Sequence, residues 1–201
     1  MIHSTTNVLV AGVGGQGVIL ASDILGEAAL AAGYDAKKTD SLGMAQRGGS
    51  VVSNVRIGER VWSPLIKEGE VDILVAFEKL EAARWVTYLR PGGVALVNNQ
   101  ATPPLSVSAG NERYPADEEI TGILKQVTDL VYFVDGTRRA RELGDARTLN
   151  VFMLGCISSF TPFIKTDVWK DCLRQRLPEK IQEINFTAFE LGRKEIESVR
   201  I

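Results

Sequence analysis

Short continuous runs of apolar residues recur along the first half of the chain. The clearest runs cover residues 7–11, 71–78 and 94–98. A strand inside a parallel sheet is buried on both faces and reads as such an unbroken run. The three runs therefore predict buried parallel strands. Weaker patterns at residues 34–40 and 131–136 predict two further strands, the first exposed on one face.

In most of the remaining chain, the apolar residues recur at the spacing of a helix. Between Val18 and Ala32 the apolar residues recur at three- and four-residue intervals, and Gly33 stands where a helix commonly ends. Residues 79–89 predict a second helix, closed by the stretch Arg90-Pro91-Gly92-Gly93. From Thr137 onward the chain reads as largely helical.

The glycine-rich stretch Ser41–Ser50 predicts a loop. The segments "VVSNVRIG" and "VWSP", on either side of Gly58 and Glu59, predict a β-hairpin inserted between two β-α-β units. The fold class expected is a three-layer, Rossmann-like α/β domain with a mostly parallel, mixed sheet and a helical C-terminal segment. We expect one domain over residues 1–201, with a helical tail over about 162–201.

Composition narrows the class of protein. Hydrophobic residues make up 45% and charged residues 24%, with a formal net charge of -2 and no long basic run, so no nucleic-acid partner is indicated. No apolar stretch reaches the ~18 to 20 residues of a membrane span, and no signal peptide is evident. The two cysteines, Cys156 and Cys172, lack the spacing of a disulfide scaffold or a metal site. We therefore expect a cytoplasmic protein with no membrane partner.

The stretch "NVLVAGVGGQGVILASDIL" carries the first chemical signal. It satisfies G-x-G-x-x-G at the turn from a strand into a helix, where backbone N–H groups and the helix dipole favour an anion. A dinucleotide-binding fold would add an acidic residue about 20 positions on, and Asp35 and Asp40 lie in that range. The other interpretation is that the glycines serve only a tight turn and close packing.

Two further groups of residues carry amides and a guanidinium. Gln16, inside the first glycine turn, could donate to a phosphate or carboxylate, or hold a neighbouring loop or subunit. In "MAQRGGSV", Arg47 could grip an anion in bidentate fashion or form an ion pair at a subunit interface. No phosphate-loop lysine, G-x-S-x-G or H-E-x-x-H motif is found, and the one histidine, His3, stands at the N-terminus. No catalytic residues are therefore assigned.

Together the two glycine segments resemble the opening of the gamma subunits of 2-oxoacid:ferredoxin oxidoreductases, above all in the indolepyruvate branch. Three later stretches are also similar: "DILVAFEKLEAARWVTYLRPGGVALVN", "ELGDARTLNVFMLG" and "NFTAFELGRKEI". The resemblance runs from about Asn7 to Glu195. Its motif residues in this sequence, expected in a ligand or interface loop, are Gly12, Gly14, Gly15, Gln16, Gly17, Gln46, Arg47, Gly48, Gly49 and Asn150.

The resemblance implies a subunit that binds no cofactor of its own. Enzymes of this family decarboxylate a 2-oxoacid oxidatively, with coenzyme A as co-substrate and ferredoxin as electron acceptor. Thiamine diphosphate and 4Fe-4S clusters are then expected in a large catalytic partner subunit. Indolepyruvate or another arylpyruvate is the expected substrate, with pyruvate and 2-oxoglutarate as alternatives. The isolated chain could pair with itself as a homodimer.

Other interpretations stay open. The chain could be a free-standing NAD-dependent dehydrogenase, or a docking module without any ligand. An arginine cluster, Arg138, Arg139, Arg141 and Arg147, could meet the phosphates of coenzyme A or form a solvated helix face paired with Glu142 and Asp145.

Overall fold

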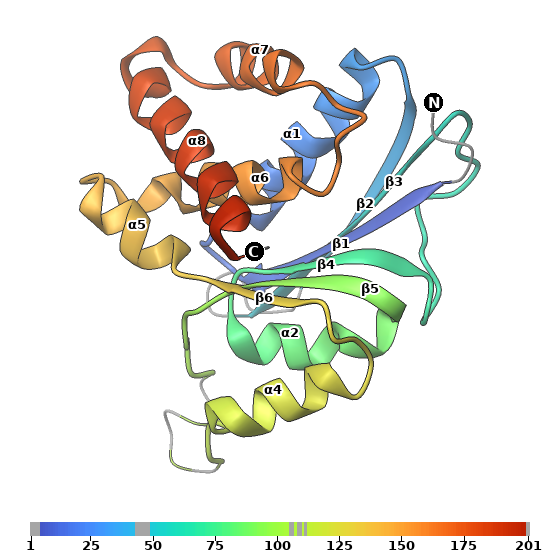
Figure 1. Cartoon of the computed structure of the whole chain (residues 1–201), viewed down its shortest axis with the longest axis vertical. Helices are drawn as coiled ribbons and strands as arrows, with labels where there is room; N and C mark the ends of the chain where they lie inside the picture. The colour runs from blue at the N-terminus through green and yellow to red at the C-terminus, as the bar shows by residue number, and fades with distance from the viewer. Residues whose placement is uncertain (1–4, 43–48, 105–106, 108–109, 111, 200–201) are drawn as a thin grey trace.

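The computed structural model describes residues 5–42, 49–104, 107, 110 and 112–199. It contains a mixed six-stranded sheet with helices on both faces (Figure 1). The strands follow the order β2-β3-β1-β4-β5-β6 across the sheet. Their bounds are β1 Thr6–Val13, β2 Asp35–Leu42, β3 Ser50–Gly58, β4 Val71–Ala76, β5 Leu89–Asn98 and β6 Val131–Val134.

Strand direction divides the sheet into two parts. β1, β4, β5 and β6 run parallel to one another, whereas β3 is antiparallel to both β1 and β2. The central strands are the most apolar ones: Val8, Leu9 and Val10 of β1 are completely buried. Such burial on both faces explains why these strands read as continuous apolar runs.

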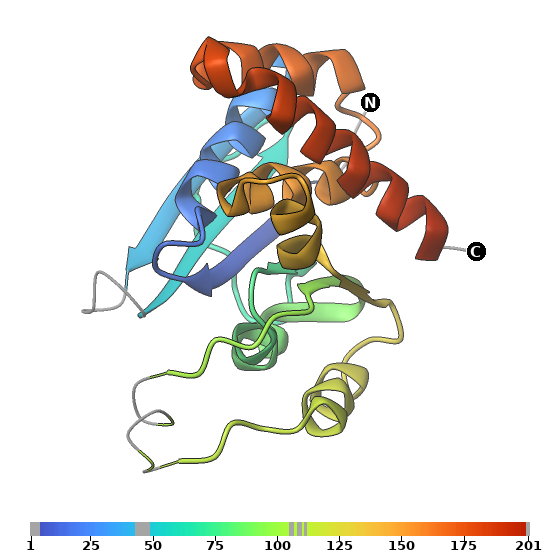
Figure 2. The same ribbon diagram turned by 90° about the vertical axis from the view of Figure 1, so that its left-hand side faces the viewer.

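One face of the sheet is covered by the larger group of helices (Figures 1 and 2). This layer contains α1 Val18–Ala31, α5 Gly136–Glu142, α6 Leu149–Ser158, α7 Thr166–Arg176 and α8 Gln182–Val199. α6 is buried along its whole length, and its neighbours α1, α5 and α8 surround it. The C-terminal helices therefore complete the core over this face.

The helices α6 and α8 cross in close contact at two glycines. A β-carbon on Gly155 would stand 2.0 Å from the Phe189 carbonyl oxygen, and one on Gly192 would stand 2.0 Å from the Phe152 carbonyl oxygen. Both distances lie far inside van der Waals contact, so neither position can hold a side chain without separating the helices.

The other face carries α2 Lys79–Trp85 and α4 Asp117–Lys125. α2 begins directly after β4, and the buried carboxylate of Glu78 caps it by accepting a hydrogen bond from the Glu81 N–H at 3.0 Å. Within the described ranges, short 3-10 turns also occur at Val86–Tyr88, Ala146–Thr148 and Glu179–Ile181. Among the residues with described positions, no helix is long and apolar enough to cross a bilayer.

The α/β class, the mixed sheet and the helical C-terminal segment are confirmed. The position predicted for the hairpin is wrong: β3 pairs with β2, not with residues 61–64, which form no strand. The Asp35 carboxylate accepts a hydrogen bond from the Val61 N–H at 2.8 Å and holds this segment beside β2 instead. The helix predicted over residues 79–89 also ends early: α2 ends at Trp85, a 3-10 turn follows over Val86–Tyr88, and Leu89 already belongs to β5.

Candidate functional site

The glycine turn lies at the carboxyl end of β1, beside the carboxyl end of β4. The connection after β1 runs through α1 on one face, whereas the connection after β4 runs through α2 on the other. Ligands of open α/β sheets bind where neighbouring connections diverge in this way. The fold therefore places the glycine turn at the edge of the sheet where a ligand site is expected.

Three glycines of the turn are required by the local backbone or by close packing. Gly17 caps α1 in the left-handed region with a φ of 82°, and Gly15 has a φ of 103°. Gly12 has no room for a side chain, because a β-carbon there would stand 2.9 Å from the β-carbon of Phe77 and 2.7 Å from Val18 Cγ2. At Gly17 a β-carbon would stand 2.8 Å from the Asn150 Nδ2 atom.

Gln16 ties the turn to the neighbouring strand. Its Oε1 atom accepts a hydrogen bond from the Val13 N–H at 2.8 Å, and its Nε2 atom donates to the Phe77 carbonyl oxygen at 3.4 Å. Of the two interpretations of this side chain, the geometry favours the one in which it holds a neighbouring segment.

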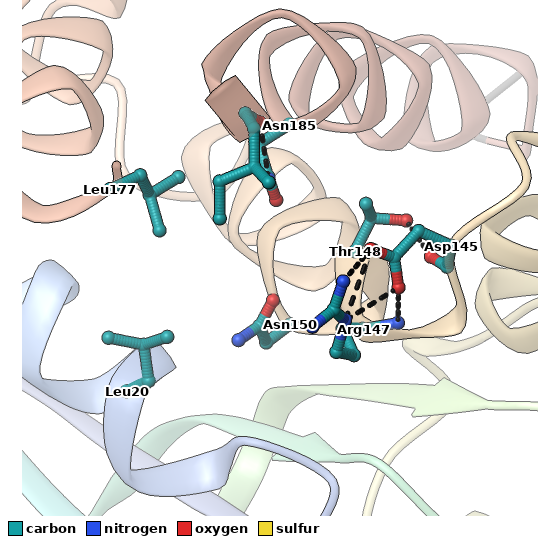
Figure 3. A pocket seen from close by; sticks show the side chains of 8 residues that line it. Leu20, Asp145, Arg147, Thr148, Asn150, Leu177 and Asn185 are labelled. Carbon is teal, nitrogen blue, oxygen red and sulfur yellow. Dashed lines mark hydrogen bonds and ion pairs between the residues drawn. The ribbon is translucent and has the colours of Figure 1, made fainter. Parts of the chain in front are cut away.

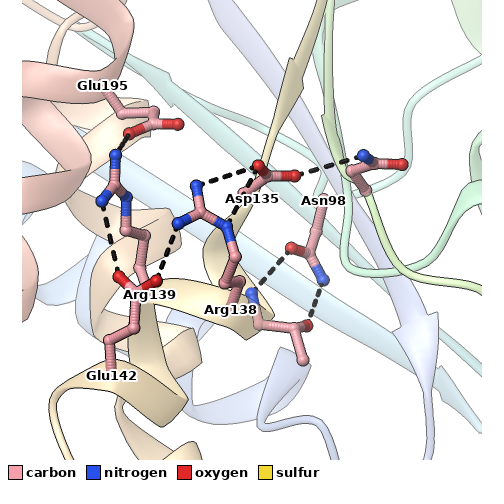
Figure 4. A network of polar contacts seen from close by, with 8 residues as sticks. Asn98, Asp135, Arg138, Arg139, Glu142 and Glu195 are labelled. Carbon is pink, nitrogen blue, oxygen red and sulfur yellow. Dashed lines mark hydrogen bonds and ion pairs between the residues drawn. The ribbon is translucent and has the colours of Figure 1, made fainter.

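Asn98 extends this network across the sheet. Its Nδ2 atom donates to the same Phe77 carbonyl oxygen at 3.0 Å and to Thr137 Oγ1 at 2.8 Å. Its Oδ1 atom accepts from the Thr137 N–H at 3.1 Å, and the side chain is completely buried (Figure 4). The carboxyl ends of β1, β4, β5 and β6 are thereby held in one arrangement.

A second buried group holds the segment after β5. The Glu78 Oε1 atom accepts hydrogen bonds from the Thr102 N–H at 3.0 Å and from the Tyr114 hydroxyl. Burial, together with this carboxylate, raises the pKa of Tyr114 well above its usual value. Tyr114 therefore stays a neutral donor, and Thr102 stays at the rim of the site.

These elements enclose a cavity of about 550 Å³, which we call the glycine-loop cavity. Its size falls within the range of small-molecule sites. The residues that line it come from the glycine turn, the end of β5, α5 and the start of α6: Gly15, Gln16, Gly17, Leu20, Gln100, Thr102, Thr137, Arg141, Ala146, Arg147, Leu149 and Asn150.

Asn150 presents an unused donor to this cavity. The residue is 8% exposed, and its Oδ1 atom accepts a hydrogen bond from the Val151 N–H at 2.8 Å. The Nδ2 atom has no acceptor within the described part of the chain. This donor is open to the cavity, where a bound acceptor could take up its hydrogen bond.

The arginine cluster separates into two groups. Arg138 pairs with Asp135 and Glu142, and Arg139 pairs with Glu142 and Glu195 (Figure 4). Arg147 grips Asp145, with Nη2 and Oδ2 at 2.7 Å, and this contact lowers the pKa of Asp145 to about 2. These three arginines match the solvated, paired interpretation.

Arg141 differs from its three neighbours. It lines the glycine-loop cavity, and no ion pair of its side chain is found with any residue whose position is described. An exposed guanidinium without a carboxylate partner, beside the start of α1, is suited to an anionic ligand.

The second glycine segment is only partly described. Gln46, Arg47 and Gly48 lie outside the described residues. Gly49 is described, and its carbonyl oxygen accepts a hydrogen bond from the Gly14 N–H at 2.9 Å. The end of this segment therefore contacts the glycine turn directly.

The geometry does not favour a dinucleotide site. β3 lies between β1 and β2, so Asp40 is separated from the glycine turn by an additional strand. The Asp40 carboxylate is already engaged by Ser53 Oγ at 2.6 Å and Lys38 Nζ at 2.8 Å. A ribose-binding acid of a dinucleotide fold stands on the strand adjacent to β1, so Asp40 does not fit that role.

The chain's own residues do not fit an iron–sulfur cluster. Such clusters need several cysteine thiolates, whereas the sequence has two cysteines, Cys156 and Cys172, both buried. Burial raises the pKa of the Cys156 thiol well above its usual value, so it is unsuited to bind as a thiolate. In the described ranges no group of three or more His, Cys, Asp or Glu side chains is arranged to hold a metal ion.

The protein is thus a mixed α/β protein. Its glycine turn lies where the connections after neighbouring strands diverge to opposite faces of the sheet. Residues 7–195 match the family described as pyruvate ferredoxin/flavodoxin oxidoreductase, and the chain belongs to that family. It is 37% identical over 190 residues to the indolepyruvate oxidoreductase subunit IorB of Pyrococcus horikoshii, with 94% of each chain covered.

Solved structures agree with the fold. The gamma subunit of a keto/oxoacid ferredoxin oxidoreductase from Geobacter sulfurreducens matches with a TM-score of 0.72 and 24% identity, covering 96% of this chain and 99% of that one. A 2-oxoglutarate:ferredoxin oxidoreductase from Magnetococcus marinus, solved with 2-oxoglutarate, coenzyme A and succinyl-CoA bound, matches with a TM-score of 0.76 and 19% identity. The match covers 98% of this chain and 32% of that longer chain.

Several site residues carry no motif in the sequence. Asn98 and Thr137 are 39 positions apart, and only the pairing of β5 with β6 brings them together. The clearest signal available for Asn98 is its place at the end of a buried strand. Arg141 stands out from the other arginines only once their carboxylate partners are located.

Proposed function

We propose that this chain is the small subunit of an indolepyruvate:ferredoxin oxidoreductase and that it acts within a complex. The observation that carries the proposal is the 37% identity to an indolepyruvate oxidoreductase subunit over 94% of both chains. The complex would convert an arylpyruvate and coenzyme A to the acyl-CoA and carbon dioxide, passing two electrons to ferredoxin. We expect it to work in the cytoplasm.

The cofactors of this reaction are assigned to a large partner subunit. Thiamine diphosphate stabilises the carbanion formed on decarboxylation, and 4Fe-4S clusters carry the electrons when they are bound. This chain's donor set does not suit a cluster, and no catalytic residue is assigned to it. Its contribution is to bind and orient a ligand at the glycine-loop cavity.

For that ligand we propose coenzyme A. Gly15, Gly17 and the start of α1 present backbone N–H groups and the positive end of the helix dipole to the cavity. Arg141 adds a positive charge that has no ion-pair partner among the described residues, and Asn150, a residue only 8% exposed, adds an amide donor. This combination of donors suits a phosphate group of the coenzyme.

The experiment is to tag this chain in its own host, purify it anaerobically and assay what co-purifies. The proposal predicts a large, brown partner subunit and coenzyme A-dependent reduction of viologen. It also predicts that kcat/KM is higher for indolepyruvate than for pyruvate or 2-oxoglutarate. Preference for either of the other acids would keep the subunit role but reject the substrate.

Isolation of a colourless chain without a partner would reject the subunit role itself. Titration of that chain with NADH, followed by nucleotide fluorescence, then tests the dehydrogenase alternative. Failure to bind any nucleotide would favour a docking module.

A further inference from the structure

A second, smaller cavity adjoins the glycine-loop cavity. It measures about 190 Å³ and lies between the start of α1, the start of α6 and the start of α8 (Figure 3). We call it the amide cavity and define it by Leu20, Thr148, Asn150, Leu177, Ile181 and Asn185, with Asp145 and Arg147 at one side. Leu20, Arg147 and Asn150 line both cavities, so one ligand can reach across from the first to the second.

Two buried asparagines give this cavity its polar character. Asn185 is 6% exposed and Asn150 is 8% exposed. The Asn185 Nδ2 atom donates to the Ile181 carbonyl oxygen at 2.7 Å, but its Oδ1 atom accepts from no described donor. Asn150 is in the opposite situation, with its Oδ1 atom occupied and its Nδ2 atom unused. Among the described residues, the pair therefore leaves one acceptor and one donor without a hydrogen-bond partner.

Both amides face the same space. Figure 3 shows the Asn150 and Asn185 side chains directed toward the region bounded by Leu20 and Leu177. Polar side chains of buried residues usually have a hydrogen-bond partner. A free donor and a free acceptor beside the same cavity therefore indicate that a bound ligand supplies the partners. The arrangement is thus suited to a ligand that both donates and accepts a hydrogen bond.

The rest of the lining restricts the ligand to an uncharged group. Leu20, Leu177 and Ile181 form apolar walls. The charges of Asp145 and Arg147 compensate each other in their ion pair. An ionic group placed against such walls would lose its hydration without a counter-charge. A planar group, in contrast, can lie against the aliphatic walls and beside the flat Arg147 guanidinium.

We propose that the amide cavity binds a planar, uncharged group of the ligand whose phosphate occupies the glycine-loop cavity, one that presents a donor next to an acceptor. The inference rests on the proposed function. Coenzyme A contains two sources of this chemistry: the edge of its adenine base and the amides of its pantetheine arm. Asparagine reads an adenine edge in this donor–acceptor manner, and it pairs equally well with an amide.

The test measures dissociation constants on the purified complex by isothermal titration calorimetry. The probes are coenzyme A, adenosine 3′,5′-bisphosphate, 4′-phosphopantetheine and pyrophosphate. Asn185→Leu removes the acceptor, and Ile181→Phe fills the cavity from its apolar wall without touching either amide. Gln182→Leu is the matched control, because it alters hydrogen bonds of the same helix start but does not line the cavity.

Both cavity variants are expected to weaken coenzyme A binding about fivefold to tenfold: Asn185→Leu through the loss of a hydrogen bond to a neutral group, and Ile181→Phe because the larger side chain excludes the ligand from the cavity. Pyrophosphate binding and the Gln182→Leu complex should be unaffected. A parallel loss for adenosine 3′,5′-bisphosphate alone identifies the base as the occupant, and one for 4′-phosphopantetheine alone identifies the amides.

Unchanged coenzyme A binding in both cavity variants would overturn the inference. Arg141→Ala distinguishes failure of the amide-cavity proposal from failure of the proposed function. If Arg141→Ala weakens coenzyme A binding while Asn185→Leu and Ile181→Phe do not, the amide cavity is not used but the proposed function stands. If none of the three variants matters, the amide-cavity proposal and the proposal that the glycine-loop cavity binds coenzyme A both fail, whereas the subunit role is tested separately by co-purification.

Discussion

Gly17 and Asn150 meet at the mouth of the glycine-loop cavity, where the Asn150 Nδ2 atom lies 2.8 Å from the position of a β-carbon on Gly17. One residue caps α1 and the other belongs to the first turn of α6. The absence of a side chain at Gly17 is what allows the amide to approach the start of α1. This close contact between the starts of α1 and α6 therefore helps to shape the cavity.

This contact predicts that substitutions at the two positions are coupled. Gly17→Ala should lower the free energy of unfolding by about 1 to 2 kcal/mol for the left-handed backbone, with a further loss from the clash with Asn150. In an Asn150→Ala background that further loss should become smaller, because the amide is removed and only the β-carbon of residue 150, at 3.1 Å, remains. A double-mutant cycle with urea unfolding measures the coupling, which we expect to exceed ~0.5 kcal/mol.

Gly15→Ala provides the control for this cycle. Gly15 has a φ of 103°, but a β-carbon there would meet no atom within 4 Å. Its substitution should carry the backbone cost without coupling to Asn150. Equal coupling at both glycines would show that the close contact is not the cause.

Asn98 is expected to stabilise the site through its hydrogen bonds as well as through its burial. Asn98→Ala leaves the Thr137 N–H and hydroxyl without their partner, so we expect a loss of about 1 to 3 kcal/mol in the free energy of unfolding. The neighbouring Asn99 donates to the exposed Asp135 carboxylate, and Asn99→Ala should change stability by less than ~0.5 kcal/mol. Similar losses for the two variants would argue against the network.

Substitution by alanine should have opposite effects on stability at Gly155, where α6 and α8 cross, and at Gly122. Gly155→Ala places a methyl group 2.0 Å from the Phe189 carbonyl oxygen and should cost about 3 kcal/mol or more. Gly122→Ala, in α4, meets nothing within 4 Å and should stabilise the protein by about 0.5 to 1 kcal/mol. Thermal unfolding of both variants checks this, and a mild effect at Gly155 would contradict the close crossing.

The ion pair between Asp145 and Arg147 should be visible in the titration of the carboxyl group. Hydrogen bonds from the Arg147 guanidinium and backbone N–H hold the pKa of Asp145 at about 2, below its usual value of 3.8. Because the folded pKa is the lower one, the stabilisation is complete above pH 3.8 and is lost as the pH falls toward 2. Carbon-detected NMR should find this midpoint, and Arg147→Met should return it toward the usual value. A midpoint already near 3.8 in the unmodified protein would show that the pair does not form in solution.

The sequence predicts local features of this fold well because they depend on neighbouring residues. Gly17 and Gly33 stand at the two ends of α1, each with positive φ, as the periodic pattern between them indicates. The position of the hairpin could not be read in this way. β3 has turn-forming residues at both of its ends, and only its pairing with β2 decides which end belongs to the hairpin.

The candidate site likewise contains some residues that local sequence predicts and others whose roles depend on the tertiary fold. The glycine turn was predictable because its spacing is local, and Gly15, Gln16, Gly17 and Asn150 all line the cavity. The roles of Asn98 and Glu78 were not predictable, because they depend on which strand ends lie side by side. Arg141 was predicted only as one of four arginines, because what sets it apart depends on which carboxylates its neighbours occupy. That the chain forms one domain, and that its glycine turn binds a ligand, remain predictions.

The central claim is that the glycine-loop cavity of this subunit binds the phosphate of coenzyme A, and two arginines of α5 allow a direct test. Arg141 lines the cavity without an ion pair among the described residues, whereas Arg138 is paired with Asp135 and Glu142 away from it. The measurement is the KM for coenzyme A of the purified complex carrying Arg141→Ala or Arg138→Ala, two changes of equal charge on one helix. The account predicts a KM raised about tenfold by Arg141→Ala, the loss of one charge-assisted hydrogen bond, and an unchanged KM with Arg138→Ala. Equal KM values for the two variants would contradict it.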